Sequence, residues 1–276
     1  MPVLLQKRRR YLMLKITNLH KTFNPGTVNA KHALNGLNLE LQDGDFVTVI
    51  GGNGAGKSTM LNAIAGVFSP DYGKIEIDGI DVTNIPEYKR AAYLGRVFQD
   101  PMKGTAADME IAENLSIAAR RGTKRRLIWG LPKKEREGYK ALLAELDLGL
   151  ENRLSSKVGL LSGGQRQAVT LLMATINKPK LLLLDEHTAA LDPKTAGKVL
   201  EITEKIVKEH SLTTVMITHN MRDAIRYGNR LIMMHEGKII VDVSGEDKEK
   251  LTVEQLLGLF SKASGDEFSS DRAMLG

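Results

Sequence analysis

The sequence predicts an α/β protein in which a core sheet is flanked by an antiparallel β edge subdomain and interrupted by an inserted α-helical subdomain. An apolar run at 46–50 leads through the glycine-rich segment GGNGAGKST into a helical stretch at 57–65. A second apolar run at 181–184 ends in two acidic residues. Apolar residues take a helical spacing between about 102 and 178, so we place the helical subdomain there.

The amino-terminal part predicts short strands over 14–48, with Gly36 and the pair Asp43-Gly44 marking turns. These strands are expected to form the antiparallel sheet at the edge of the domain. The run at 46–50 is apolar throughout and bounded by polar turns, which is typical of a buried central strand.

The carboxyl-terminal part returns to an α/β pattern after the acidic pair. A helix is predicted from about Pro193 to His210, followed by the strand TTVMIT. A further helix is expected after Asn220, and the segment RLIMMHEGKIIVDV predicts a hairpin.

The expected organisation is one main domain with two small appendages. The main domain spans 13–244. A basic extension occupies 1–12, and no apolar run of the kind found in signal peptides follows it. The segment 245–276 predicts one short amphipathic helix, around 251–260, and a polar tail, which is too short for another domain.

Composition excludes several classes of function. The 276 residues contain no cysteine, which excludes disulfides, thiolate metal sites and cysteine nucleophiles. No stretch reaches the roughly 18 to 20 apolar residues of a membrane span, so we expect membrane contact to be made through a partner. With 39 Lys and Arg against 33 Asp and Glu, the net charge of +6 favours anionic partners such as nucleotide, nucleic acid or acidic lipid.

The segment GGNGAGKST matches the phosphate-loop pattern G-x-x-x-x-G-K-[ST] through Gly51, Gly56, Lys57 and Ser58. In such a loop, backbone N–H groups surround a polyphosphate, the lysine reaches the β and γ phosphates, and the hydroxyl ligates Mg²⁺. An ordinary glycine-rich turn is the alternative, but the flanking strand and helix favour the phosphate loop. The predicted nucleotide-binding residues here are Gly51, Asn53, Gly54, Ala55, Gly56, Lys57, Ser58 and Thr59.

The acidic pair Asp185-Glu186 stands at the carboxyl end of a predicted strand, where open α/β sheets bind ligands. Asp185 is a candidate Mg²⁺ ligand, and Glu186 is a candidate to polarise an attacking water. The alternative is a strand that ends in two solvated acids. The phosphate loop in the same chain favours the catalytic interpretation.

A third motif, LSGGQ at 161–165, is followed by the helical segment RQAVTLLMATI. This motif resembles the signature of ATP-binding-cassette (ABC) ATPases. That family carries a phosphate loop, a glutamine loop, the signature, the LLLLDE strand, a D-loop and a switch histidine in this order, and this chain shows all six between about 14 and 243. The resemblance implies a P-loop NTPase core with ATP and Mg²⁺ as cofactors.

The signature residues are Ser162, Gly163, Gly164 and Gln165. The resemblance implies that they contact the γ-phosphate held by the other subunit of a head-to-tail dimer. A hydroxyl and glycine N–H groups at a helix start also suit an anion. By itself, however, SGG is equally a flexible turn.

Four single residues receive roles from the same resemblance. Gln99 resembles the glutamine that senses Mg²⁺ and the attacking water and links to the membrane partner; alone it indicates an exposed loop residue. Asp192 resembles the D-loop acid of the dimer interface, although Asp-Pro also forms a helix N-cap. His219 resembles the switch histidine that bonds the γ-phosphate and orients Glu186, and Phe23 resembles the aromatic that stacks on adenine. The alternatives are a structural histidine and a core phenylalanine.

Together with these four residues, the motifs define the predicted catalytic residues and the predicted metal ligands. The predicted catalytic residues are Lys57, Gln99, Glu186 and His219. The predicted metal ligands are Ser58, Gln99 and Asp185.

Two departures from the usual ABC sequence narrow the resemblance to one branch of the family. His187 follows the acidic pair where proline is commoner, and the signature helix is less basic than usual. Both, with FQDPMKGTAADMEIAENL, resemble a branch of importer ATPases associated with tryptophan-like or tyrosine-like uptake systems. An aromatic amino acid or related small solute is therefore the implied cargo.

Three classes of function remain. The first is a transporter motor: ATP joins two copies and hydrolysis separates them, which works a separate permease through the groove near Gln99. This class implies import with an extracytoplasmic solute-binding protein, and a cytoplasmic location on the inner face of the cell membrane. The second is a soluble ABC ATPase acting on nucleic acid or ribosomes, but such proteins carry coiled-coil insertions, zinc cysteines or two cassettes, so no nucleic acid is expected. The third, a catalytically quiet module, is disfavoured because Lys57, Glu186 and His219 are intact.

Overall fold

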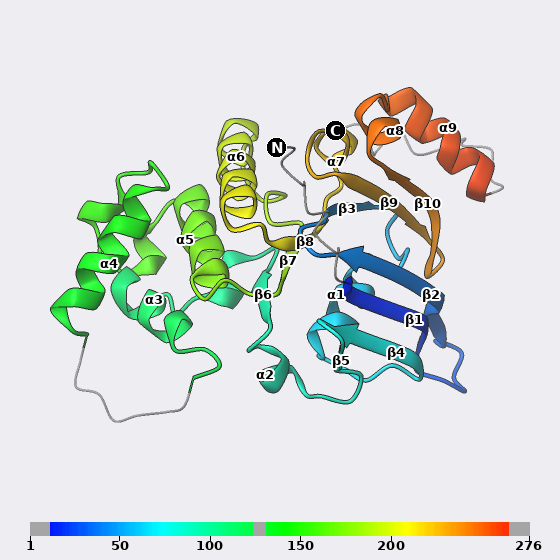
Figure 1. Cartoon of the computed structure of the whole chain (residues 1–276), viewed down its shortest axis with the longest axis horizontal. Helices are drawn as coiled ribbons and strands as arrows, with labels where there is room; N and C mark the ends of the chain where they lie inside the picture. The colour runs from blue at the N-terminus through cyan, green and yellow to red at the C-terminus, as the bar shows by residue number, and fades with distance from the viewer. Residues whose placement is uncertain (1–11, 124–130, 265–276) are drawn as a thin grey trace, which may run out of the picture.

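The computed structural model describes residues 12–123 and 131–264, so the predictions for most of the basic extension and for the end of the polar tail lie outside the described residues. Two sheets and a block of helices lie next to one another (Figure 1). The larger sheet has the order β10-β9-β3-β8-β7-β6. Its strands are β3 (Phe46–Ile50), β6 (Leu94–Val97), β7 (Leu181–Asp185), β8 (Thr213–Ile217), β9 (Arg230–His235) and β10 (Lys238–Ser244).

The larger sheet is parallel except for β10, which pairs antiparallel with β9 as the predicted hairpin. Every residue of β3 and β8 is buried, because helices cover both faces of a parallel sheet. The prediction of a buried central strand at 46–50 is confirmed. The carboxyl ends of β3, β7 and β8 meet at one edge, which positions the candidate site.

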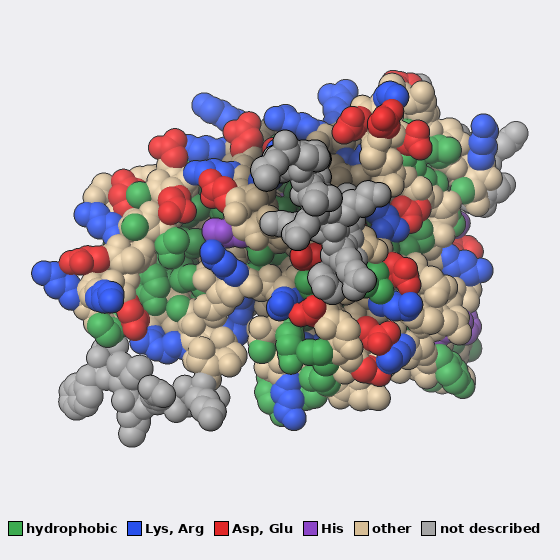
Figure 2. Space-filling view, in the orientation of Figure 1, with side chains coloured by type: hydrophobic (Ala, Val, Ile, Leu, Met, Phe, Trp, Pro, Cys, Tyr) green, Lys and Arg blue, Asp and Glu red, His purple; other side chains and the backbone are tan. Residues whose placement is uncertain are grey.

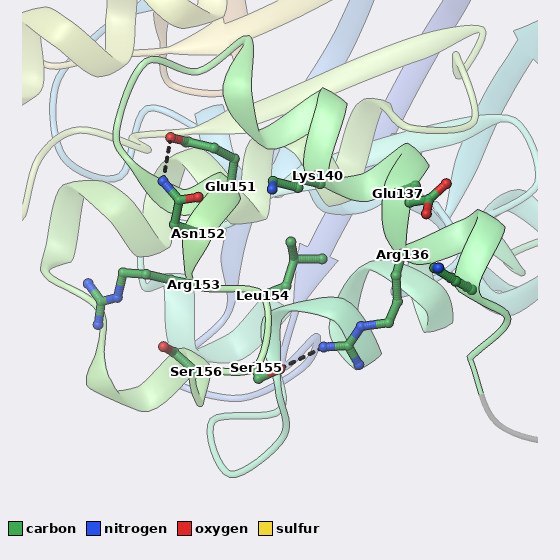
Figure 3. A pocket seen from close by; sticks show the side chains of 10 residues that line it. Arg136, Glu137, Lys140, Glu151, Asn152, Arg153, Leu154, Ser155 and Ser156 are labelled. Carbon is green, nitrogen blue, oxygen red and sulfur yellow. Dashed lines mark hydrogen bonds between the residues drawn. The ribbon is translucent and has the colours of Figure 1, made fainter.

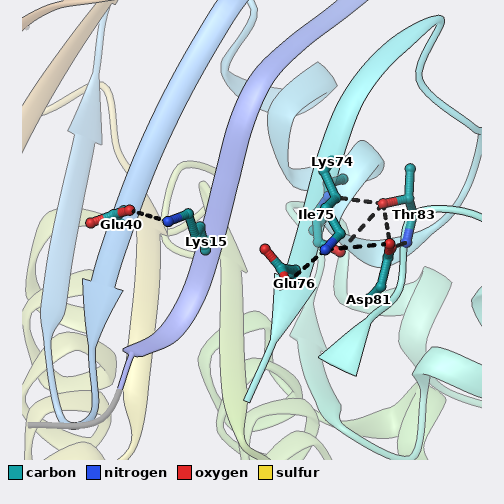
Figure 4. A network of polar contacts seen from close by, with 7 residues as sticks. All are labelled: Lys15, Glu40, Lys74, Ile75, Glu76, Asp81 and Thr83. Atoms are coloured by element: carbon teal, nitrogen blue, oxygen red, sulfur yellow. Dashed lines mark hydrogen bonds and ion pairs between the residues drawn. The ribbon is translucent and has the colours of Figure 1, made fainter. Parts of the chain in front are cut away.

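The smaller sheet is the predicted antiparallel edge sheet, with the order β2-β1-β4-β5. Its exposed face carries ion pairs between neighbouring strands (Figure 4), among them Lys15 to Glu40 at 2.9 Å, two residues that are direct partners in the β1–β2 ladder. Its strands are β1 (Leu12–Phe23), β2 (Lys31–Gln42), β4 (Tyr72–Ile77) and β5 (Ile80–Asp81).

The prediction that Gly36 marks a turn is wrong. Gly36 lies inside β2 with a φ of 71°, and β1 opposite it is irregular, with Asn18 at a φ of 45° and register shifts between Ile16 and His20. A Cβ on Gly36 would lie 3.3 Å from Oδ1 of Asn18. The glycine therefore serves a β-bulge, which needs the same positive φ as a tight turn.

The helices form two groups. The inserted helical block contains α3, α4 and α5, which pack on the larger sheet around apolar residues such as Leu115, Leu143 and Val169. The others cover the two sheets. Their bounds are α1 (Lys57–Ala65), α2 (Glu87–Arg90), η1 (Pro101–Gly104), α3 (Ile111–Ala119), α4 (Lys133–Ala144), η2 (Leu150–Asn152), η3 (Val158–Leu160), α5 (Gly163–Thr175), α6 (Pro193–His210), α7 (Met221–Arg226), α8 (Glu246–Glu249) and α9 (Val253–Ser264).

The carboxyl-terminal segment contains two helices, where the sequence predicts one. In the additional short helix, α8, Lys248 is 2% exposed and donates to the carbonyl oxygens of Ile225 in α7 and of Tyr227 and Gly228 directly after it. This buried ammonium satisfies carbonyls that α7 leaves without partners. Within the described residues, none of the helices combines the length and the apolar character needed to span a bilayer.

Candidate nucleotide site

The phosphate-loop segment connects β3 to α1 directly, as the sequence predicts. Gly51, Gly54 and Gly56 have φ values of 149°, 82° and 99°, which favour glycine. A Cβ on Gly51 would collide with the carbonyl oxygen of Met234, and one on Gly56 with that of Ala33. Two of the glycines are therefore required by close backbone packing, in addition to any approach of a phosphate.

Lys57 begins α1 and is 6% exposed. Its ammonium donates to the carbonyl oxygens of Gly51 at 2.6 Å and Gly52 at 3.1 Å, so it lies across the loop. Burial lowers the pKa of Lys57, while the carboxylates of Glu186 and Asp185 oppose that shift. Of the remaining loop residues, Asn53 and Ser58 are exposed, Ala55 is buried and Thr59 is half-buried.

Ser58 and Asp185 meet at the end of β7, where the Ser58 hydroxyl donates to Oδ1 of Asp185 at 3.4 Å. Burial raises the pKa of the Asp185 carboxyl; the Arg96 guanidinium opposes this shift and the Glu186 carboxylate adds to it. A hydroxyl and a carboxylate side by side are hard oxygen donors of the kind that Mg²⁺ prefers. These two residues therefore fit a Mg²⁺ ion.

Glu186 and His219 are in direct contact, with 2.6 Å between Oε1 and Nε2. The parallel pairing of β7 with β8 aligns Asp185 with Ile217, so the residues that follow the two strands lie side by side. The Glu186 side chain is 11% exposed and that of His219 is 47% exposed. Glu186 also has a φ of 48°, a conformation that non-glycine residues rarely adopt and that is concentrated at functional sites.

Phe23 and Gln99 stand at the margin of this site. Phe23, the last residue of β1, is 37% exposed, so the ring is not the core phenylalanine of the alternative interpretation. Its ring meets Phe68 edge to face at 5.4 Å between centroids. Gln99 follows β6, is exposed, and makes no hydrogen bond within the part of the chain that the structure describes.

The signature residues stand at the start of α5. Ser162 is the N-cap: its hydroxyl accepts from the Gln165 N–H, and the Gln165 side chain accepts from the Ser162 N–H, both at 3.3 Å. This is a capping box, which orders the segment and disfavours a flexible turn. Gly163 and Gly164 open the helix, and a Cβ on Gly164 would collide with the methyl group of Thr195.

Asp192 caps the next helix, since its Oδ1 accepts from the Thr195 N–H at 3.1 Å and Pro193 follows at the first helical position. The capping interpretation of Asp192 is confirmed. The signature and this cap lie on the helical side of the molecule, whereas α1 lies beyond β6 and β7 (Figure 1). Within the described chain, no hydrogen bond or ion pair joins Ser162 to the phosphate loop.

Arg96, in β6, belongs to the site although none of the sequence motifs indicates it. Its Nη2 donates to Oδ1 of Asn62 at 2.6 Å and lies 3.8 Å from Oδ2 of Asp185, and its guanidinium lies 4.5 Å from the Phe98 ring centroid. The Asp185 carboxylate therefore faces Ser58 with one oxygen and a cation with the other. The available signal was a charged residue in the middle of the short strand LGRV.

A polar groove lies apart from this site, in the helical block (Figure 3). It measures about 540 Å³ and lies between α4 and the segment 151–156. Arg136 spans it and donates to the Ser155 hydroxyl at 2.6 Å. A much smaller cavity of about 20 Å³, lined in part by Gly51, His219 and Phe260, adjoins the phosphate loop.

Comparison with known proteins agrees with this geometry. The family model described as ABC transporter matches residues 34–189. The tyrosine transport ATP-binding protein of Clostridioides difficile (strain R20291) is 46% identical over 251 residues, which cover 91% of this chain and 100% of that protein. The spermidine/putrescine import ATP-binding protein PotA of Haemophilus influenzae is 32% identical over 89% of this chain, which spans 63% of that protein.

Solved structures give the same result for the fold. The ATP-binding cassette MJ0796, in a dimeric post-hydrolysis state bound to ADP and Pi, has a TM-score of 0.72 at 30% identity, covering 84% of this chain and 98% of that one. CbiO1 of Clostridium perfringens, part of an ABC transporter complex, has a TM-score of 0.73 at 26% identity, covering 91% and 95%. The predicted P-loop core with its edge sheet and helical subdomain is confirmed. The chain therefore belongs to the ABC transporter family, and it is an ATP-binding ATPase of transport systems.

Proposed function

We propose that the chain hydrolyses ATP as a head-to-tail dimer and thereby drives import of an aromatic amino acid, or a related small solute, through a separate membrane permease. The observation that carries the proposal is the division of the site within one chain. The Glu186–His219 pair stands beside the phosphate loop, while the ordered signature start lies on the far side of β6 and β7. A second copy facing the first would bring its Ser162 to the loop.

In the proposed reaction, water attacks the γ-phosphorus of ATP and the bond to ADP breaks. The Glu186 carboxylate accepts the proton of that water, and His219, 2.6 Å away, holds the carboxylate in place. Lys57 binds the β and γ phosphates from the start of α1. Mg²⁺, held by Ser58 and Asp185, would neutralise charge on the phosphates when bound.

The permease is proposed to dock beside Gln99. This residue is exposed, and Met102, in the 3-10 turn that follows, is 41% exposed. A polar and an apolar side chain on the same loop suit a protein partner. The location is then cytoplasmic and peripheral on the membrane, with an extracytoplasmic solute-binding protein completing the system.

The cargo proposal is supported by the relative that is 46% identical and named for tyrosine transport. The alternative of a soluble ATPase acting on nucleic acid receives less support. Figure 2 shows Lys and Arg side chains interspersed with Asp and Glu over the face that is drawn, rather than gathered in one basic stripe. Nucleic-acid binding favours such a stripe.

The absence of native cysteine makes the dimer testable by cross-linking. One preparation carries Asn53→Cys in the phosphate loop and the other Ser162→Cys in the signature. On mixing under mild oxidation, we expect a disulfide-linked dimer that forms only with ATP. A mixture of Ser162→Cys with Lys140→Cys, on the remote helix α4, is the control. Absence of an ATP-dependent link at the 53/162 pair would refute the head-to-tail arrangement.

The transport part is tested by affinity purification of the chain from native membranes. We expect a permease and a solute-binding protein to co-purify, and uptake of labelled tyrosine to depend on Glu186. Recovery with RNA or ribosomes and no membrane protein would instead establish the soluble class. Uptake of spermidine but not of tyrosine would overturn the cargo assignment alone.

A further inference from the structure

Lys31 lies between the two parts of the candidate nucleotide site. It is the first residue of β2 and pairs in the antiparallel ladder with Phe23, the last residue of β1. Its side chain extends to the phosphate loop, where its Nζ lies 3.1 Å from the position that a Cβ on Gly54 would occupy. The strand β2, which begins at Lys31, also packs against α1, the helix that follows the phosphate loop (Figure 1).

The Lys31 ammonium is exposed and has no carboxylate partner within the described residues. Its neighbour Lys21 differs, because that ammonium donates to Asp71 and to the Ser69 carbonyl oxygen, both at 2.9 Å. An uncommitted cation next to the outer face of a phosphate loop suits an anionic group of the ligand. The Lys31 ammonium is therefore available to an anionic group of a ligand that lies between Phe23 and Gly54.

We propose that Lys31 binds the α-phosphate of the nucleotide; this inference rests on the proposed function, with the β and γ phosphates in the loop and adenine on Phe23 as the family resemblance implies. The ribose and the α-phosphate are the covalent link between those two groups, so they cross the gap that Lys31 spans. The pairing of Phe23 with Lys31 sets the position of both residues relative to one another. Because ATP and ADP share the α-phosphate, the contact stabilises both complexes by the same factor.

The test is nucleotide affinity measured by isothermal titration calorimetry on Lys31→Met. We expect ATP and ADP to bind about 2–5-fold more weakly, the range for one partly solvated charge contact, with the same factor for both. Adenosine, which lacks phosphate, should bind as it does to the parental chain. Lys31→Arg keeps the charge and should retain most of the affinity.

Lys140→Met is the matched control, since Lys140 is an exposed lysine of α4 with no ion pair in the described structure. A urea midpoint equal to that of the parental chain excludes a folding defect in Lys31→Met. Equal nucleotide affinity for the two Met variants would overturn the proposal, and a loss confined to ATP would overturn the α-phosphate assignment. A parental chain that bound no ATP would instead refute the proposed function itself.

Discussion

Replacing Glu186 by Gln removes the proposed general base while leaving its shape. The change keeps a side chain of the same size beside His219, at a position where the Glu186 backbone already has a φ of 48°. It removes the ability to accept a proton from water. General base catalysis contributes about 10²–10⁴-fold, so the loss corresponds to about 3–5 kcal/mol of activation free energy.

The assay measures phosphate release at saturating ATP alongside ATP affinity and oligomeric state. We expect kcat to fall by about 10²–10⁴-fold, with ATP affinity retained and a dimer that persists in ATP because it is no longer hydrolysed. Glu209→Gln, an exposed carboxylate on α6, controls for the lost charge and should hydrolyse normally. A Glu186→Gln chain that turned over ATP at the parental rate would refute the assignment of the base.

Three further predictions follow from single contacts. Lys57→Ala removes the ammonium that lies across the loop, so ATP should bind at least about 10-fold more weakly by calorimetry; unchanged affinity would contradict the phosphate-loop assignment. Burial lowers the pKa of His187 from 6.5 to about 4. The unfolded chain therefore binds a proton at this residue before the folded chain does, so the free energy of unfolding is highest above about pH 6.5 and decreases as the pH falls towards 4. Between pH 7 and pH 5 the loss is about 2 kcal/mol in urea unfolding, and His187→Gln should remove that part of the pH dependence; an identical slope in the variant would exclude His187 as its source. Gly164→Ala should destabilise the chain by about 1–3 kcal/mol because the new methyl meets Thr195. Adding Thr195→Ser, which lacks the colliding methyl, should restore most of the urea midpoint, and a double variant no more stable than the single one would count against this contact.

The predicted helices and strands agree best with the structure where a few neighbouring residues determine the element. The strand at 46–50, the helix at 57–65 and the helix at 193–210 are all confirmed with the expected bounds. Their apolar spacing, the Asp-Pro cap and the glycine loop act over a few residues. The wrong prediction at Gly36 also rested on a local signal. A turn and a β-bulge both need a positive φ, and only the pairing with the opposite strand distinguishes them.

The motifs of the candidate site could be predicted from the sequence, but the contacts between distant segments in that site could not. The residue types of Lys57, Asp185 and Glu186 indicate phosphate and metal chemistry wherever they stand at strand ends. Nothing in the sequence places Arg96 next to Asp185 or Lys31 next to Gly54, because these contacts join segments that are distant along the chain.

The sequence by itself determined the local elements, the order of the motifs and the family, since each depends on residue type and short-range spacing. The family resemblance implied that His219 orients Glu186 and that the signature serves a second copy, but only the tertiary structure gives the direct contact of His219 with Glu186 and the position of the signature start away from the phosphate loop of its own chain. The physical reason is the register of the sheet: β7 and β8 align so that both strands bury their apolar faces, and that alignment brings the two side chains to 2.6 Å.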